Sequence, residues 1–163
     1  MGLTAQAAYW FLPAVIPIAI YVAWNDMRVM KIPNAANYLL LASYAVLGYF
    51  ALGSFELYLW HWTHFFVVLA VGILFWMSGV IGGGDVKFMA AAAPMVALAD
   101  LRVFLLIYAS CLLGALVTHR LAKHSPLRKI APDWASWDNA RFPKGLALSG
   151  TLLFYLFGVA ITR

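Results

Sequence analysis

The stretch "SGVIGGGDVKFMAAAAP", Ser78 to Pro94, interrupts an otherwise apolar chain with three consecutive glycines, an aspartate and a lysine. An acidic residue at membrane depth is costly and usually has a function, so Asp85 needs an explanation. Two interpretations are open at this point. Asp85 is either a solvated residue of a flexible interhelical hinge or one half of a catalytic site.

The composition of the chain is that of a membrane protein. Of the 163 residues, 65% are hydrophobic and 10% are charged, against roughly 45–50% and about 25% in soluble domains. We therefore expect one all-α integral membrane domain over residues 1–163, with about six transmembrane helices. The expected spans are 7–24, 37–53, 65–81, 86–99, 102–118 and 146–161. The first segment lacks the basic start of a signal peptide and is expected to be retained.

The basic residues indicate how this domain is oriented. Eleven lysines and arginines against six acidic residues give a net charge of +5, and nine of the eleven fall in the loops on one side of six spans. Because cytoplasmic loops are enriched in Lys and Arg, we expect a cytoplasmic loop at 119–145 and external termini. Membrane lipid is then the expected surroundings, and the charge gives no reason to expect nucleic-acid binding.

Only two of the six acidic residues fall at the same depth. Asp26 and Asp85 both lie where an apolar segment meets the cytoplasmic edge, whereas Glu56, Asp100, Asp133 and Asp138 fall in loops. Two carboxylates held close together share one proton, so one can act as a base on water and the other as an acid. Helix-end dipoles favour an ionised Asp85 and a protonated Asp26.

Several neighbours of these acids have both a structural and a functional interpretation. Gly82, Gly83 and Gly84 allow positive φ angles and close approach of a substrate backbone, or they form a simple hinge. Arg28 is expected to anchor the membrane edge, and Lys87 either bonds to the site or extends to the interface. In "DMRVMKIPN", Asp26 to Asn34, Pro33 is expected to end one helix after Ile32 and Asn34 to cap the next.

The sequence predicts neither a metal nor a cofactor. His61 and His64 stand three residues apart, but without a nearby acid they fit an aromatic belt better than a metal site. Cys111 is the single cysteine and has no partner for a disulfide or a zinc site.

Two motifs together resemble the prepilin peptidases, the membrane aspartic proteases of type IV and tight-adherence (Flp) pilus systems. These motifs are D-x-R-x-x-x-I-P-N at Asp26–Asn34 and G-x-G-D-x-K-x-x-A at Gly82–Ala90. "FPKGLALSG", Phe142 to Gly150, resembles the family's Pro-x-Gly entry to the last helix, at Pro143 and Gly145, with Lys144 where an aromatic residue is common. The resemblance implies Asp26 and Asp85 as the catalytic pair and a cytoplasmic active site in the bacterial inner membrane. It also implies cleavage of a prepilin leader peptide.

Long members of this family carry an N-terminal region with paired cysteines and also methylate the new N-terminus. This chain resembles the short, peptidase-only branch, and we expect no methyltransferase activity. Two other classes stay open: a small transporter or channel component with intramembrane carboxylates, and a non-catalytic pilus-assembly subunit. The sequence names neither the pilin nor the oligomeric state.

Overall fold

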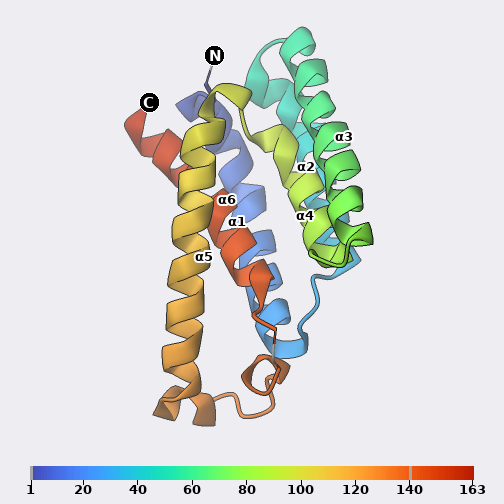
Figure 1. The fold of residues 1–163 in the computed structure, drawn as a ribbon. Coiled ribbons are helices and arrows are strands. Elements are labelled where there is room, and N and C mark those ends of the chain that lie inside the picture. Colours follow the sequence, from blue (N-terminus) through green and yellow to red (C-terminus); the bar gives the residue numbers. More distant parts are fainter. Residues whose placement is uncertain (1, 140) are drawn as a thin grey trace.

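The computed structural model describes residues 2–139 and 141–163. These residues form a bundle of six α-helices, and no strand occurs among them (Figure 1). The helices are α1 (Ala5–Val29), α2 (Asn34–Leu52), α3 (Phe55–Met77), α4 (Gly83–Ala92), α5 (Leu101–Lys123) and α6 (Lys144–Thr162). All except α4 are long and apolar enough to cross a membrane. The prediction of an all-α membrane protein is therefore confirmed.

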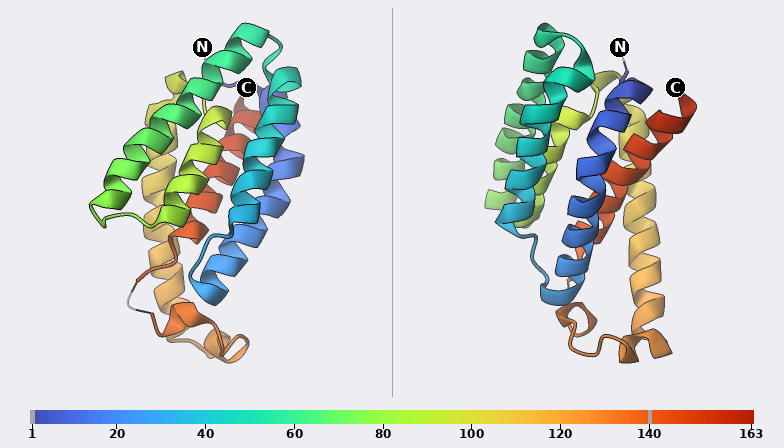
Figure 2. Two further views of the ribbon diagram at one scale, coloured as in Figure 1. Left: turned by 90° about the vertical axis from the view of Figure 1, so that its right-hand side faces the viewer. Right: turned by 180° about the vertical axis from the view of Figure 1, so that it is seen from behind.

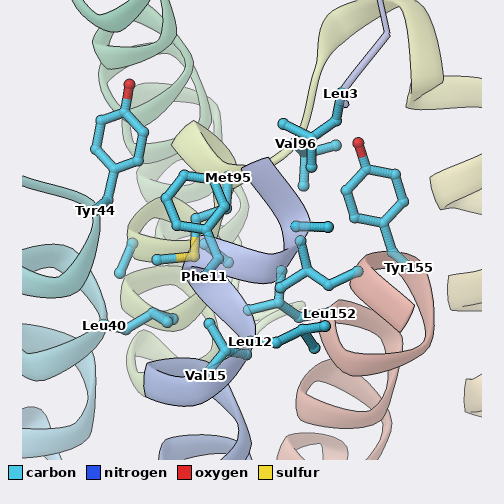
Figure 3. Packing of buried hydrophobic residues seen from close by; sticks show 14 of the residues in the cluster. Leu3, Phe11, Leu12, Val15, Leu40, Tyr44, Met95, Val96, Leu152 and Tyr155 are labelled. Carbon is cyan, nitrogen blue, oxygen red and sulfur yellow. The ribbon is translucent and has the colours of Figure 1, made fainter. Parts of the chain in front are cut away.

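Helix α1 forms the centre of the bundle. It packs against α6 on one side and α2 on the other, and α5 lies outside α6 (Figure 2). The core between these helices contains Phe11 and Val15 of α1, Leu40 of α2 and Leu152 of α6, all fully or almost fully buried (Figure 3). Helices α3 and α4 pack closely on each other and complete the bundle on the far side of α2.

The fourth apolar segment forms α4, a helix of 10 residues that is too short to cross a membrane. Pro94 has no backbone N–H and its ring conflicts with a preceding carbonyl, so α4 ends at Ala92. Two 3₁₀ turns, Ala93–Met95 and Leu98–Asp100, carry the chain on to α5. Non-helical backbone at membrane depth must find hydrogen-bond partners within the protein.

Two histidines of α3 supply those partners. The Nδ1 of His61 lies 2.8 Å from the carbonyl oxygen of Pro94, and the Nδ1 of His64 lies 3.0 Å from that of Val96. Because a carbonyl oxygen can only accept, each Nδ1 carries the proton and donates it. The spacing of three residues thus matches two carbonyls of the non-helical segment that are two residues apart, which explains this pair better than an aromatic belt does.

The helix ends differ in detail from the expected ones. Helix α1 ends at Val29, three residues earlier than expected, and Met30 takes the left-handed conformation with φ 56°. Pro33, not Asn34, is the N-cap of α2. Among Gly82, Gly83 and Gly84 none has a positive φ, and the left-handed glycine of this turn is Gly79, with φ 76°. Helix α3 begins well before the apolar run at 65–81, because the polar residues His61 and His64 lower the local hydropathy without breaking the helix.

The chain termini and three of the interhelical connections lie at opposite ends of the bundle. Both chain termini lie at one end, and the α1–α2, α3–α4 and α5–α6 connections lie at the other (Figure 1). The last of these connections folds back, so that its 3₁₀ turn Ala135–Trp137 contacts α1. Trp137 is buried and stacks on His119 of α5, with ring centroids 5.2 Å apart.

Candidate active site

Asp26 lies in the last turn of α1 and is held by the beginning of α6. Its side chain is only 5% exposed. The backbone N–H of Gly145 donates to its Oδ2 at 2.6 Å. Gly145 is the second residue of α6, where backbone N–H groups have no partner within the helix and stabilise negative charge. The dipole of α6 therefore opposes that of α1 at Asp26, an effect that the sequence did not predict.

The hydrogen bond to Asp26 leaves no room for a side chain at position 145. A Cβ placed on it would lie 2.9 Å from both the Cβ and the Oδ2 of Asp26, closer than real side chains approach. Pro143, the N-cap of α6, is buried beside it. Because proline restricts its own φ, it sets the direction in which α6 begins. Pro143 and Gly145 thus lie directly at one of the two acids.

Asp85 is the third residue of α4, and its carboxyl folds back over the start of that helix. The Gly82 backbone N–H interacts with this carboxyl, as an acid at this position does in a capping box. Burial raises the pKa of Asp85 above its ordinary value, while the Lys144 ammonium and the Gly82 N–H act in the opposite direction. Asp85 is half-buried, so it is more accessible than Asp26.

The fold brings these two acids to one end of the bundle. Asp26 and Asp85 are close enough to interact electrostatically. The start of α4 packs against the loop after α1, since a Cβ on Gly84 would lie 3.4 Å from the Ile32 Cβ. Gly83 faces Trp76 at the end of α3, with a corresponding distance of 3.4 Å to its Nε1. At both positions an added Cβ would make ordinary van der Waals contacts, so Gly83 and Gly84 lie in normally packed interfaces.

The two basic residues of the motifs have other partners. Lys87 donates to the Oδ1 of Asn34 at 3.0 Å and so links α4 to the start of α2. Arg28 is exposed, with its guanidinium 5.1 Å from the centroid of the Trp24 ring. In the structure, Lys87 links two helix ends and Arg28 is exposed beside Trp24.

Two residues near Asp85 were not considered for it from the sequence. Lys144, the first residue of α6, acts electrostatically on Asp85. Tyr108 of α5 lies within electrostatic range of the same carboxyl. Tyr108 carries no motif that could have identified it, whereas Lys144 was visible as an unusual residue between Pro143 and Gly145.

An apolar groove of about 540 Å³ begins beside Tyr108. It lies between α3 and α4 on one side and α5 and α6 on the other. Its lining includes Val67, Phe88, Met89, Phe104 and Leu152. Two of its lining residues are near Asp85: Phe88 is one helical turn after it, and Tyr108 is within electrostatic range of its carboxyl.

Metal binding would need a group of suitable ligands. Within residues 2–139 and 141–163 no three His, Cys, Asp or Glu side chains are grouped in a way that could hold a metal ion. The chemistry that these residues offer is that of two carboxyl groups, a lysine and the backbone N–H groups of two helix starts.

A helical membrane protein with two carboxyl groups that interact at one end of its bundle fits the class of intramembrane hydrolases. The model of the type IV leader peptidase family matches residues 14–119 of this chain. The chain belongs to that family, which makes it a peptidase with prepilin substrates and an integral membrane protein. No curated protein and no solved structure is significantly similar to it. The match covers both acids but ends before α6, so the importance of Lys144 and Gly145 rests on geometry.

Proposed function

We propose that this protein is an aspartic endopeptidase that removes the leader peptide of Flp-type prepilins, with Asp26 and Asp85 as its catalytic pair. The observation that carries the proposal is that Asp26, in the last turn of α1, and Asp85, in the first turn of α4, lie within electrostatic range of each other at the end of the bundle where the loops lie. The family match supports a leader peptidase in general. The single cysteine of this sequence leaves no cysteine pair of the kind that the methylating members carry, which favours a peptidase without methyltransferase activity.

The two acids have environments that suit different roles. Asp26 is the more deeply buried, which favours the neutral form, and a protonated carboxyl can still accept the Gly145 N–H through its carbonyl oxygen. Asp85 is more accessible and has Lys144 and the start of α4 near it, which favour the anion. We therefore assign the base to Asp85 and the acid to Asp26, as a description of a coupled pair.

The reaction follows from this assignment. Asp85 takes a proton from water, the water oxygen attacks the scissile carbonyl carbon, and Asp26 gives its proton to the carbonyl oxygen. The resulting diol collapses when the C–N bond breaks. Asp85 then protonates the leaving amine nitrogen, and one diol hydroxyl returns its proton to Asp26. The products are the leader's carboxyl group and the new amino terminus, and both acids regain their starting forms.

The apolar groove supports a substrate that remains partly in the membrane. A leader peptide is polar and would approach the two acids from the loop side, whereas an apolar segment after the cleavage point fits the groove. Main-chain contacts near Gly82 and Gly83 would hold the backbone at the scissile bond.

Substitution of the two acids tests the mechanism. Asp26→Asn and Asp85→Asn should each abolish cleavage of a pilin precursor, measured as a gel shift in detergent, because asparagine cannot exchange the shared proton. The double variant should be hardly worse than either single one. The exposed acids Glu56 and Asp133 provide matched controls, and Glu56→Gln and Asp133→Asn should retain cleavage. Processing near the wild-type rate by a folded Asn variant would refute the mechanism and show that cleavage depends on other residues.

We further propose that the site faces the cytoplasm, in the inner membrane, with both termini external. The nine-to-two distribution of basic residues supports this orientation. Replacing Cys111 with serine and Arg128 with cysteine places a label in the α5–α6 connection. A membrane-impermeant thiol reagent should modify this cysteine only after the cells are opened. Labelling from outside intact cells would reverse the orientation.

A further inference from the structure

The first two residues of α6 reach both halves of the proposed site. The Gly145 N–H donates to Asp26 at the end of α1. The Lys144 side chain extends in the other direction, with its Nζ 3.4 Å from the carbonyl oxygen of Val80 in the α3–α4 connection. Val80 is five residues before Asp85, and helix α4 also contacts α6 directly. The start of α6 therefore connects the element that carries Asp26 with the element that carries Asp85.

The charged surroundings of Asp85 make this lysine distinctive. Asp26 of α1, Tyr108 of α5 and Lys144 of α6 are titratable groups of neighbouring elements within electrostatic range of its carboxyl. On α4 itself, Lys87 is bound to Asn34 of α2. In the part of the chain that the structure describes, Lys144 thus brings a positive charge within electrostatic range of Asp85 while its Nζ contacts the Val80 carbonyl. Its side chain is half-buried, so its charge is less screened by water than that of a fully exposed lysine.

We propose that Lys144 is a positioning residue of this peptidase, and that its ammonium group keeps Asp85 ionised while its contact with Val80 holds the α3–α4 connection against α6. The proposal rests on the proposed function, because it assigns Lys144 to the same pair of acids. It accounts for a basic residue between Pro143 and Gly145, a position at which an aromatic side chain could contribute packing but no charge. Lys144 is not a catalytic residue, since it acts through Asp85.

A structural role and an electrostatic role have different kinetic consequences. If Lys144 only anchors the membrane edge or supports Val80, its loss lowers activity or stability equally at every pH. If it stabilises the Asp85 anion, its loss makes protonation of Asp85 easier. The acid side of the pH–rate profile, which reports the ionisation of the base, then moves to higher pH.

The experiment compares pH–rate profiles of purified variants on a synthetic peptide that contains a basic leader, the cleavage site and the first residues of the mature pilin. Lys144→Met keeps the length of the side chain and removes its charge, and Lys144→Arg keeps the charge. Lys129→Met removes a lysine from the exposed α5–α6 connection and serves as the matched control. Thermal unfolding in detergent is measured for each variant.

Lys144→Met should shift the acid side of the profile to higher pH. At acid pH its kcat/KM should fall by about three- to tenfold, with a smaller loss at higher pH. Lys144→Arg should restore the wild-type profile, and Lys129→Met should match the wild type. A folded Lys144→Met variant whose profile keeps the wild-type shape, at any rate, would overturn the proposal.

A separate result would show that the proposed function itself has failed. Retained cleavage by Asp85→Asn would remove the base on which Lys144 is proposed to act. An inactive Asp85→Asn variant together with an unshifted Lys144→Met profile would instead refute the role of Lys144 alone. If Lys144→Met does not fold, Lys144→Gln, which keeps a polar end group without charge, takes its place in the same comparison.

Discussion

At the scale of single residues, the absence of a side chain at Gly145 determines where Asp26 can lie. The carboxyl of Asp26 occupies the space that a Cβ would take, and this allows its Oδ2 to accept the Gly145 N–H at 2.6 Å. The backbone of α6 is thereby used as a hydrogen-bond donor to a buried acid. Such a contact fixes the carboxyl more firmly than a flexible side-chain donor would, because the direction of a backbone N–H is set by the helix geometry.

Gly145→Ala is expected to displace Asp26 and to reduce cleavage strongly. The added methyl group would lie 2.9 Å from the carboxyl, so the carboxyl or α6 must move, and a misplacement of about 1 Å can cost ~10²-fold in rate. Gly158→Ala, in the same helix with nothing within 4 Å of the added methyl group, is the matched control and should leave the rate unchanged. Cleavage of a pilin precursor and thermal unfolding are measured together. A fully active Gly145→Ala variant would show that Asp26 does not need this contact.

The candidate site could be predicted from the sequence only in part, and the reason lies in the residues themselves. Asp26 and Asp85 stand out because acids are rare in this chain, and the motifs around them pointed to the same pair. The Pro-x-Gly resemblance pointed to Gly145, but its contact with Asp26 and the positions of Lys144 and Tyr108 depend on α5 and α6 packing beside α1 and α4. Nothing in the local sequence encodes that arrangement. The sequence also allowed positive φ angles at Gly82, Gly83 and Gly84, whereas the glycine of this stretch with a positive φ is Gly79.

At the scale of elements, α4 is a short helix that ends at Ala92, and both α4 and the 3₁₀ turn after it pack against α3. Hydropathy correctly indicated an apolar segment after Asp85, but it could not show how the backbone after Ala92 finds its hydrogen-bond partners. His61 and His64 provide them from α3. Helix α3 also approaches α4 closely at Gly72, where a Cβ would lie 2.5 Å from the Val86 Cγ1. Because Val86 follows Asp85 directly, the packing of α3 bears on the position of that acid.

Gly72→Ala should therefore weaken both stability and cleavage. Shortening Val86, the side chain that the added methyl group would meet, should reverse the effect. The added methyl group must push Val86 aside, and overpacking of this kind costs about 1–3 kcal/mol. In the double variant Gly72→Ala/Val86→Ala the space is restored, so thermal unfolding and cleavage should recover relative to Gly72→Ala alone. Gly114→Ala, in α5 with open space around the added methyl group, controls for the effect of alanine in a helix. Additive losses in the double variant would contradict the proposed contact.

At the scale of the whole molecule, the two ends of the bundle hold different groups of polar residues. The end with the loops holds the two acids of the proposed site. The other end holds a group of residues that we name the outer clasp: Leu3, Asp100, Tyr155 and Arg163. Asp100, treated from the sequence as a loop acid, is 4% exposed. It forms a salt bridge with Arg163 at 2.6 Å and accepts hydrogen bonds from the Leu3 N–H and the Tyr155 hydroxyl. The outer clasp thus ties α1, α5 and α6 together near both termini.

Asp100→Asn is expected to lower stability without removing activity. The asparagine has no negative charge to pair with Arg163, and a hydrogen bond to a charged group contributes about 1.5–3 kcal/mol. Because the Arg163 side chain is 41% exposed, water compensates part of this loss, and the lower end of that range is expected. Thermal unfolding in detergent should shift down by several degrees. At a temperature where the variant stays folded, it should cleave a pilin precursor at close to the wild-type rate. The outer clasp joins residues next to both chain termini, and the termini lie at the opposite end of the bundle from the α1–α2 and α3–α4 connections (Figure 1), which adjoin Asp26 and Asp85. Complete loss of cleavage by a folded Asp100→Asn variant would mean that the two ends are coupled, and that the acids at the loop end do not act as an independent site.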